Sequence, residues 1–387
     1  MSVPELEAWR DLCRRLERAG EALLESPFPQ SDRDRAEGFD HLARQLLCWL
    51  GWSTGYGDPG APSFMRQNDL VLQWGGPNVD NIYRHARIDP TKRYRITGRM
   101  HSCEQFVLAL RAGFMHQPKW GTLTEITASS LGINAGSDIR ILLGPGDASD
   151  GFIPIPDDAI MVSLREYYFE WSADEPATFA IECLDSDGVA PVEPVDLVTR
   201  FTEAASGVEL SMSHWNRYLL DYRAAGHDNT FSEPIKVAKG LDAARYSFCF
   251  WNLGPDDALI VHTTVPDAAY WSLQTYLLGW FRAGDFAHHI TSLNHRQVTR
   301  TSGGTVHVVL AHRDPGTPNW IDTEGRSEGM LSYRWFWGTD NPTVSTKVVR
   351  HSDVRANLPA DTPLVSVEAR ADEIAARRAH ASWRYRS

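Results

Sequence analysis

From about Trp52 onward, apolar residues come in short runs that are broken every few positions by Gly, Pro, Asn and Asp. This texture is typical of an antiparallel sheet, whose short strands alternate with tight turns. In the run YYFEW at residues 167–171, alternate side chains fall on opposite faces of one strand. One face then meets a core and the other meets water or a second layer, which predicts a mostly β fold.

The expected strands occupy two stretches of the chain. They are residues 93–100, 122–130, 139–143, 159–171 and 178–183, and then 246–252, 258–264, 270–277, 296–301, 306–311 and 330–337. Gly303 and Gly304 indicate a hairpin turn between two of the later strands. A chain of 387 residues exceeds the size at which one core keeps growing, so we expect two antiparallel β lobes, with one very large β domain as the alternative.

Helical spacing of apolar residues appears at both ends and in the middle of the chain. Leu6 to Leu23 and the stretch after Ser31 predict an N-terminal helical hairpin, with Ser31 and Asp34 as a capping pair. Early acidic and late basic residues predict a helix over 366–385. The expected domains are a hairpin at 1–51, a β lobe at 52–193, a helical connection at 194–240, a β-sandwich lobe at 241–350 and a helical tail at 351–387.

Charge and composition exclude several classes of protein. The chain has 38 Lys and Arg against 50 Asp and Glu, and a net charge of -12 disfavours nucleic acid as a partner. The charged N-terminal residues do not resemble a signal peptide, and no run of 18 apolar residues predicts a membrane span, so we expect a cytoplasmic protein. The five cysteines form no C-x-x-C pair, which predicts reduced thiols.

Residues 145–196 contain 13 acidic residues and a single basic residue, Arg165. Such a block is usually a solvated acidic face, and a cation site is the alternative.

The stretch from residue 266 to 337 is similar to the domain of unknown function 1214 family, whose pattern it follows in order and spacing. The matching residues are Trp271, Ser272, Asn294, Asp314, Pro315, Gly316, Asn319, Trp320, Gly329, Arg334 and Trp335. Residues 75–99 resemble an upstream segment of longer relatives, with Val79 where those have proline. The resemblance implies a β-sandwich or jelly-roll-like lobe and leaves the activity open.

Aromatic residues indicate the kind of ligand. The chain has 14 Trp, and a cleft lined by Trp and Tyr faces suits a planar or ring-shaped molecule. Core packing is the alternative for each of them. The predicted substrate-binding residues are Trp271, Gln274, Asn294, Trp320, Trp335 and Asn81.

Four residues are the candidates for catalysis. Histidine occupies both protonation states near neutral pH, which makes His85 and His295 candidate bases. Tyr83 shares a strand face with His85 if residues 82–86 are extended. Arg334 lies in an aromatic strand, where its charge requires an anionic ligand or an ion pair with Asp314 or Asp322.

One pattern indicates a metal. His312, Asp314 and the later His351 resemble the facial triad of non-haem iron oxygenases, although the Asp-Pro-Gly turn already explains Asp314. The chain contains no phosphate-binding loop, no dinucleotide fingerprint and no serine nucleophile elbow.

The sequence therefore favours an acid/base enzyme without a cofactor, most consistent with a lyase of small-molecule catabolism that acts on a hydroxylated aromatic or other ring compound. One alternative is a non-catalytic carrier of hydrophobic or sugar-like molecules, and another is an iron oxygenase that uses His312, Asp314 and His351. The expected partner is a small molecule; neither nucleic acid nor a membrane is expected, and a homo-oligomer is compatible with the sequence.

Overall fold

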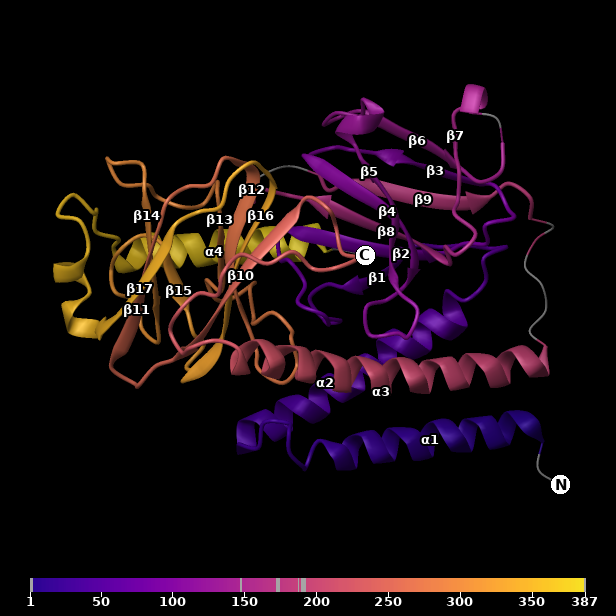
Figure 1. Cartoon of the computed structure of the whole chain (residues 1–387), viewed down its shortest axis with the longest axis horizontal. Helices are drawn as coiled ribbons and strands as arrows, with labels where there is room; N and C mark the ends of the chain where they lie inside the picture. Colours follow the sequence, from indigo (N-terminus) through magenta and orange to yellow (C-terminus); the bar gives the residue numbers. More distant parts are fainter. Residues whose placement is uncertain (1–2, 147, 172–174, 187, 189–192, 386–387) are drawn as a thin grey trace. The chain divides into compact units, whose positions relative to one another are not determined.

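The computed structural model describes residues 3–146, 148–171, 175–186, 188 and 193–385 (Figure 1). The chain divides into two compact units. Unit 1 comprises Met1–Gly75, Asn81–Tyr168 and Asp174–Arg217, and unit 2 comprises Gly76–Asp80, Phe169–Ala173 and Tyr218–Ser387. Two short segments within the first half of the sequence therefore belong to the second unit.

The helices of unit 1 form one layer. They are α1 (Pro4–Ala22), α2 (Asp32–Leu50), the π-helical turn η1 (Gly51–Gly55) and the part of α3 (Pro194–Ala224) that precedes residue 218. Ser31 caps α2 as predicted, since its hydroxyl accepts the Asp34 amide at 3.1 Å. Trp9 of α1 packs on Phe201 of α3 at 5.5 Å, which joins the hairpin to the long helix.

Two sheets complete unit 1. The first has the order β1 (Met65–Asn68), β2 (Asn81–Arg87), β8 (Met161–Tyr167), β4 (Gln105–Gly113) and β5 (Gly121–Thr127), all antiparallel. The second has the order β7 (Phe152–Ile153), β6 (Asp138–Leu143), β3 (Tyr94–Arg99) and β9 (Thr178–Cys183), with β6 and β7 parallel. Phe106 of β4 meets Phe179 of β9 at 5.6 Å, so one face of the first sheet packs on the second.

Unit 2 is a β-sandwich. One sheet has the order β10 (Ala244–Asn252), β16 (Glu328–Gly338), β12 (Ala268–Tyr276) and β13 (Ser292–Asn294). The other has the order β15 (Trp320–Asp322), β14 (Val306–Ala311), β11 (Asp257–Thr263) and β17 (Val344–Arg350), with β14 and β15 parallel. Helix α4 (Val367–Arg384) follows. The remaining short helices of the chain are η2 (Ser129–Leu131), η3 (Ala148–Asp150), η4 (His351–Asp353) and η5 (Arg355–Asn357).

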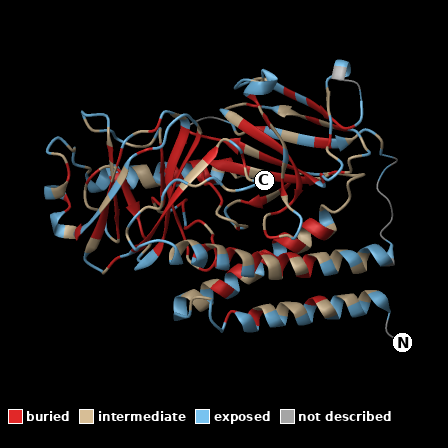
Figure 2. Ribbon diagram, viewed as in Figure 1, coloured by how far each residue is buried: buried red, intermediate tan, exposed pale blue. Residues whose placement is uncertain are grey.

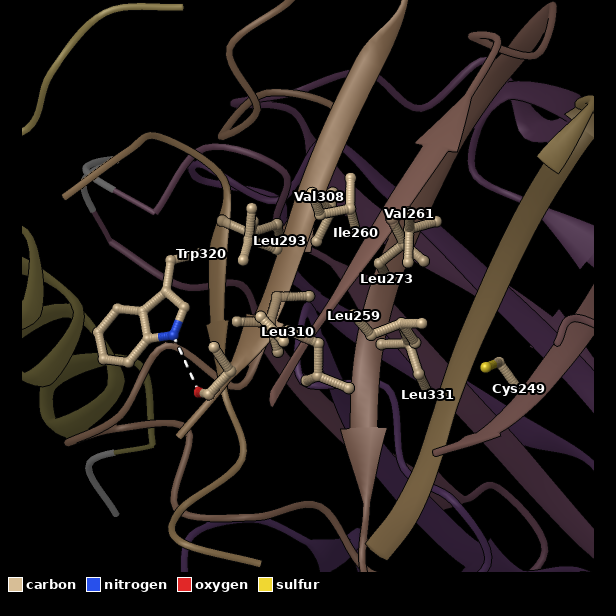
Figure 3. Packing of buried hydrophobic residues seen from close by; sticks show 14 of the residues in the cluster. Cys249, Leu259, Ile260, Val261, Leu273, Leu293, Val308, Leu310, Trp320 and Leu331 are labelled. Carbon is tan, nitrogen blue, oxygen red and sulfur yellow. Dashed lines mark hydrogen bonds between the residues drawn. The ribbon is translucent and has the colours of Figure 1, made fainter. Parts of the chain in front are cut away.

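The core of unit 2 lies between its two sheets (Figure 3). Alternate residues of β12 and β16 enter it, among them Leu273 and Leu331, and belong to the same cluster as Val308 and Leu310 of β14. The intervening residues of β12 and β16 therefore lie on the opposite face of their sheet. Most residues of the strands in both units are buried (Figure 2).

The fold class predicted from the sequence is confirmed: the described chain is mostly β, with a helical hairpin at its start and a helix at its end. Two local predictions are wrong. Residues 296–301 are not a strand, because the chain turns at 294–298 after the short β13. The strand expected to reach residue 171 ends at Tyr167, and Phe169 and Trp171 lie in a segment that belongs to unit 2.

No helix in the described part of the chain combines the length and the apolar character that crossing a bilayer requires.

Candidate functional site

One face of the first sheet in unit 1 carries a group of basic side chains. Cross-strand pairing places His85 of β2 opposite Ser163 of β8, which in turn pairs with Ala109 of β4. Side chains of opposed residues share a face, so these three form one row across the sheet. Arg165 lies in the row on one side and Arg111 in the row on the other.

His85, Arg111 and Arg165, which we call the basic cluster, act on one another electrostatically. Burial, together with the charges of Arg111 and Arg165, holds the pKa of His85 well below its ordinary value. Burial and the Arg165 charge lower the pKa of Arg111 to about 9. His85 is therefore neutral at pH 7, while Arg111 is still a cation.

The cluster lacks counter-charges within the described part of the protein. Arg111 is 8 % exposed, and among the described residues neither Arg111 nor Arg165 takes part in an ion pair. The Nε atoms of both arginines and Nδ1 of His85 are buried and have no hydrogen-bond partner in the described part of the chain. Two other arginines of this sheet differ, since Arg84 pairs with Glu166 and Arg87 pairs with Glu203.

Aromatic rings surround His85 on its helix-facing side. The imidazole lies edge-on to Phe114 at 5.2 Å and to Trp52 at 6.5 Å, and Trp74 is at 6.4 Å. We call Trp52, Trp74 and Phe114 the aromatic wall. These rings come from η1, from the segment before β2 and from the residue after β4, so three separate parts of the sequence build one apolar boundary.

His116 lies behind this wall. It stacks on Phe114 and lies 4.6 Å from the ring of Trp49, and burial lowers the pKa of its imidazole to about 3. Neither ring nitrogen has a hydrogen-bond partner among the described residues. His116 is a second neutral histidine in unit 1, and no pattern in the sequence distinguishes it from the other histidines.

The structure brings together two of the predicted catalytic residues. Tyr83 and His85 share a face of β2, as the sequence predicts for an extended segment, and Arg165 lies 5.6 Å over the Tyr83 ring. Asn81 begins the same strand, but its amide donates to the Glu166 carbonyl at 2.7 Å. That bond gives Asn81 a structural role between β2 and β8.

The tryptophans predicted to bind substrate lie in the core of unit 2. Trp271 and Trp335 are both 1 % exposed and pack between the sheets. Trp320 belongs to the same core and donates from Nε1 to the Ala311 carbonyl at 3.1 Å (Figure 3). These three rings fill the sandwich instead of lining a hollow.

The opposite face of the β12 sheet carries a buried carboxylate network, which we call the Asp80 network. Asp80 is 1 % exposed and accepts three hydrogen bonds: from Trp171 Nε1 at 2.7 Å, from the Tyr270 hydroxyl at 2.7 Å and from Asn294 Nδ2 at 2.9 Å. Burial and the Asp80 charge raise the pKa of Tyr270 well above its ordinary value. Asn294 also donates to the Phe169 carbonyl, so its predicted binding group is already engaged.

Gln274 and Arg334 lie on this same face. The Gln274 amide donates to the Pro77 carbonyl at 2.9 Å and accepts the Val79 amide at 3.1 Å. Arg334 donates to the Tyr276 hydroxyl, and its guanidinium lies 5.5 Å over that ring. The two carboxylates expected as partners of Arg334 pair with other residues, Asp314 with Arg370 and Asp322 with His289.

His295 lies at the edge of the Asp80 network. Its ring is 5.0 Å from Phe169 and 5.8 Å from Tyr270. Burial lowers its pKa to about 4, and its Nδ1 has no hydrogen-bond partner in the described chain. His295 belongs to unit 2 and Tyr83 with His85 to unit 1, so the predicted catalytic residues fall in two separate clusters.

The residues proposed for iron do not form a metal site. His312 contacts Thr323 Oγ1 at 2.7 Å and the Gly254 carbonyl at 3.1 Å, and His351 contacts the Arg313 carbonyl at 3.1 Å. Asp314 is held by Arg370. Within the residues that the structure describes, no group of three or more His, Cys, Asp or Glu side chains could hold a metal ion.

A small pocket lies beside β14 in unit 2. Its cavity volume is about 40 Å³, and its lining includes Arg300, His307, Asn319 and Asp361. This volume has room for a few water molecules. The Asn319 side chain is hydrogen-bonded to main-chain groups of Thr299 and His307.

Comparison with known proteins identifies relatives in structure. The chain is similar to the crystal structure of an uncharacterized protein from Burkholderia cenocepacia, with 27% identity, a TM-score of 0.83 and coverage of 89% of this chain and 97% of that one. A protein from Vibrio parahaemolyticus aligns at 12% identity and a TM-score of 0.49, over 87% of this chain and 100% of its own. No family model matches the chain, and no curated protein matches it. The resemblance to the domain of unknown function 1214 family therefore stays a prediction.

Sequence reasoning missed both arginines of the basic cluster as functional residues. Arg165 could have been found from the sequence, because it is the one basic residue in an acidic stretch of 52 residues, from 145 to 196. For Arg111, the only indication in the sequence is its place in the apolar run QFVLALRAG. Asp80, Trp171 and Tyr270 were missed because their partners are distant in the sequence.

Proposed function

We propose that this protein is an acid/base enzyme of the lyase type that acts on a hydroxylated aromatic or other ring compound, with His85 as the base. The observation that carries the proposal is a buried, neutral imidazole that adjoins both an aromatic wall and two arginines for which the described residues provide no counter-ion. A neutral imidazole can accept a proton at once, without first losing one.

Each neighbour of His85 has a role in this proposal. The aromatic wall makes the surroundings of His85 apolar, which suits a ring compound. Arg111 and Arg165 stabilise negative charge that develops on the substrate when the base takes its proton, and stabilisation of this kind usually contributes most to the acceleration of such a reaction. Tyr83, half-buried on the same face of β2, supplies a hydroxyl that can return a proton to the product.

The test is a search for product formation. The purified protein is incubated with a panel of phenolic and other hydroxylated ring compounds, and products are followed by liquid chromatography and mass spectrometry. Once a substrate is found, His85→Gln should lower kcat/KM by about 100-fold or more, the usual effect of removing a general base. Its melting temperature should stay close to that of the wild type.

The matched control is His295→Gln, which removes the neutral histidine of unit 2. This variant should keep its activity. Loss of activity in His295→Gln but not in His85→Gln would instead place the chemistry beside the Asp80 network.

A carrier is the second candidate, because the same aromatic wall could hold a ring compound without transforming it. Binding of a panel compound by the wild type with no product over long incubation would favour the carrier and reject the enzyme.

A further inference from the structure

The basic cluster has an excess of positive charge that no described residue balances. Three basic groups converge on one buried place, and only basic groups, beside burial, shift the pKa values of His85 and Arg111. Buried cations in proteins are almost always paired with an anion or stabilised by hydrogen bonds. The Nε atoms of both arginines lack such bonds within the described chain.

The sheet geometry explains how the two arginines meet. Arg165 and Arg111 belong to adjacent strands, one row on either side of the row formed by His85, Ser163 and Ala109. Rows on one face of a strand are about 7 Å apart, a distance that an arginine side chain can span. Because Ser163 and Ala109 are small, both guanidiniums can reach over the middle row toward His85.

The two arginines differ in exposure, so the basic cluster has a solvent-facing side and a buried side. Arg111 is buried, whereas Arg165 and Tyr83 are half-buried and so reach solvent. An anion that enters past Arg165 would meet Arg111 and His85 next. The buried aromatic wall makes the boundary beside His85 apolar.

We infer that this site binds the carboxylate of an aromatic or other planar ring compound, with the anion between Arg111 and Arg165 and the ring toward the aromatic wall. A guanidinium fork matches the two oxygens of a carboxylate, and a phosphate would not use the flat apolar surface. This inference rests on the proposed function for its choice of site and adds the charge of the substrate.

The test measures binding alone, by isothermal titration calorimetry of the full chain. The probes are benzoate and 4-hydroxybenzoate, and the comparison ligands are phenol and inorganic phosphate. The dissociation constant for benzoate should be at least ten-fold lower than those for phenol and phosphate. Equal binding of phenol would overturn the role of the charge, and equal binding of phosphate would overturn the role of the ring.

Variants of the arginines locate the site. Arg111→Gln and Arg165→Gln should each weaken benzoate binding by ten-fold or more. Arg93→Gln, which removes an exposed arginine of the same unit paired with Asp185, should leave the binding unchanged. Equal weakening in all three variants, or in none, would overturn the assignment.

Thermal denaturation separates a binding role from a structural one. Removing a buried cation that has no partner should leave the melting temperature of Arg111→Gln equal to or above that of the wild type. A melting temperature lowered by several degrees would show that Arg111 serves the fold.

Binding and turnover are measured independently, so the two proposals fail separately. Benzoate binding that depends on Arg111 and Arg165, without product from any panel compound, would keep the carboxylate site and reject the lyase. Product formation from uncharged compounds, without benzoate binding, would keep the lyase and reject the carboxylate site.

Discussion

Two buried ionisable side chains, Asp80 and Arg111, differ in whether the folded chain supplies them with partners. The Asp80 carboxylate accepts hydrogen bonds from Trp171, Tyr270 and Asn294, so both of its oxygens have donors within the folded chain. Arg111 is also buried, and it has no counter-ion among the described residues. A satisfied charge supports the fold, whereas an unsatisfied one indicates a ligand.

The Asp80 network makes a prediction about stability. In Asp80→Asn, one acceptor oxygen becomes an N–H donor, which faces either the N–H groups of Trp171 and Asn294 or the hydroxyl of Tyr270 that now donates to Asp80. The charge that favours the nearby Arg377 cation is also lost. The free energy of unfolding, measured by urea denaturation, should fall by about 2–4 kcal/mol.

Asp256→Asn is the matched control for this substitution. Asp256 pairs with Arg313 at the surface, where the two side chains are 65% and 61% exposed. Its loss should cost less than about 1 kcal/mol. Equal effects of the two substitutions would contradict a stabilising role for the Asp80 network.

Elements with strong local signals were predicted close to their true bounds. β9 and β14 match the expected ranges, and α2 begins after its predicted cap. β2 was foreseen only conditionally, because its buried polar residues Arg84 and His85 hide the alternation of apolar side chains. β4 was missed for a related reason, since both of its faces are buried and its apolar run has no period.

Helix α3 packs closely on α2 at one glycine. A Cβ added at Gly207 would lie 2.8 Å from Trp49 Cγ, closer than side chains tolerate. Although alanine normally favours a helix over glycine, Gly207→Ala should lower the free energy of unfolding by about 1–3 kcal/mol through this clash. Urea denaturation monitored by tryptophan fluorescence measures the change.

Gly55→Ala provides the comparison, since a Cβ there would meet nothing within 4 Å. It should alter the free energy of unfolding by less than about 1 kcal/mol. A stabilised Gly207→Ala variant would show that Trp49 and α3 move apart without cost.

At the scale of the whole molecule, buried neutral histidines couple stability to pH. Burial lowers the pKa values of His85, His116, His295 and His380 in the folded chain. The unfolded chain takes up protons at about pH 6.5, where the folded chain does not, so stability should fall as the pH drops below about 6.5. His289 opposes this trend: burial lowers its pKa, but the bond to Asp322 raises it above the ordinary value.

The measurement is urea denaturation at pH 7.5 and pH 5. Fully buried His116 alone should account for about 2 kcal/mol of the loss, from about 1.5 pH units at about 1.36 kcal/mol each. His116→Phe keeps an aromatic ring against Trp49 and removes the titration, so its stability should depend less on pH. A wild-type stability that is unchanged between the two pH values would contradict the burial of neutral histidines.

The sequence by itself determined the β character, the helical hairpin, the terminal helix and the shared face of Tyr83 and His85. These depend on local periodicity and on capping, which neighbouring residues decide. Only the tertiary structure decided that Trp271 and Trp335 fill a core, and that Arg111 and Arg165 join His85. Those outcomes depend on which strands pair and which faces are covered, and residues far apart in the chain set both.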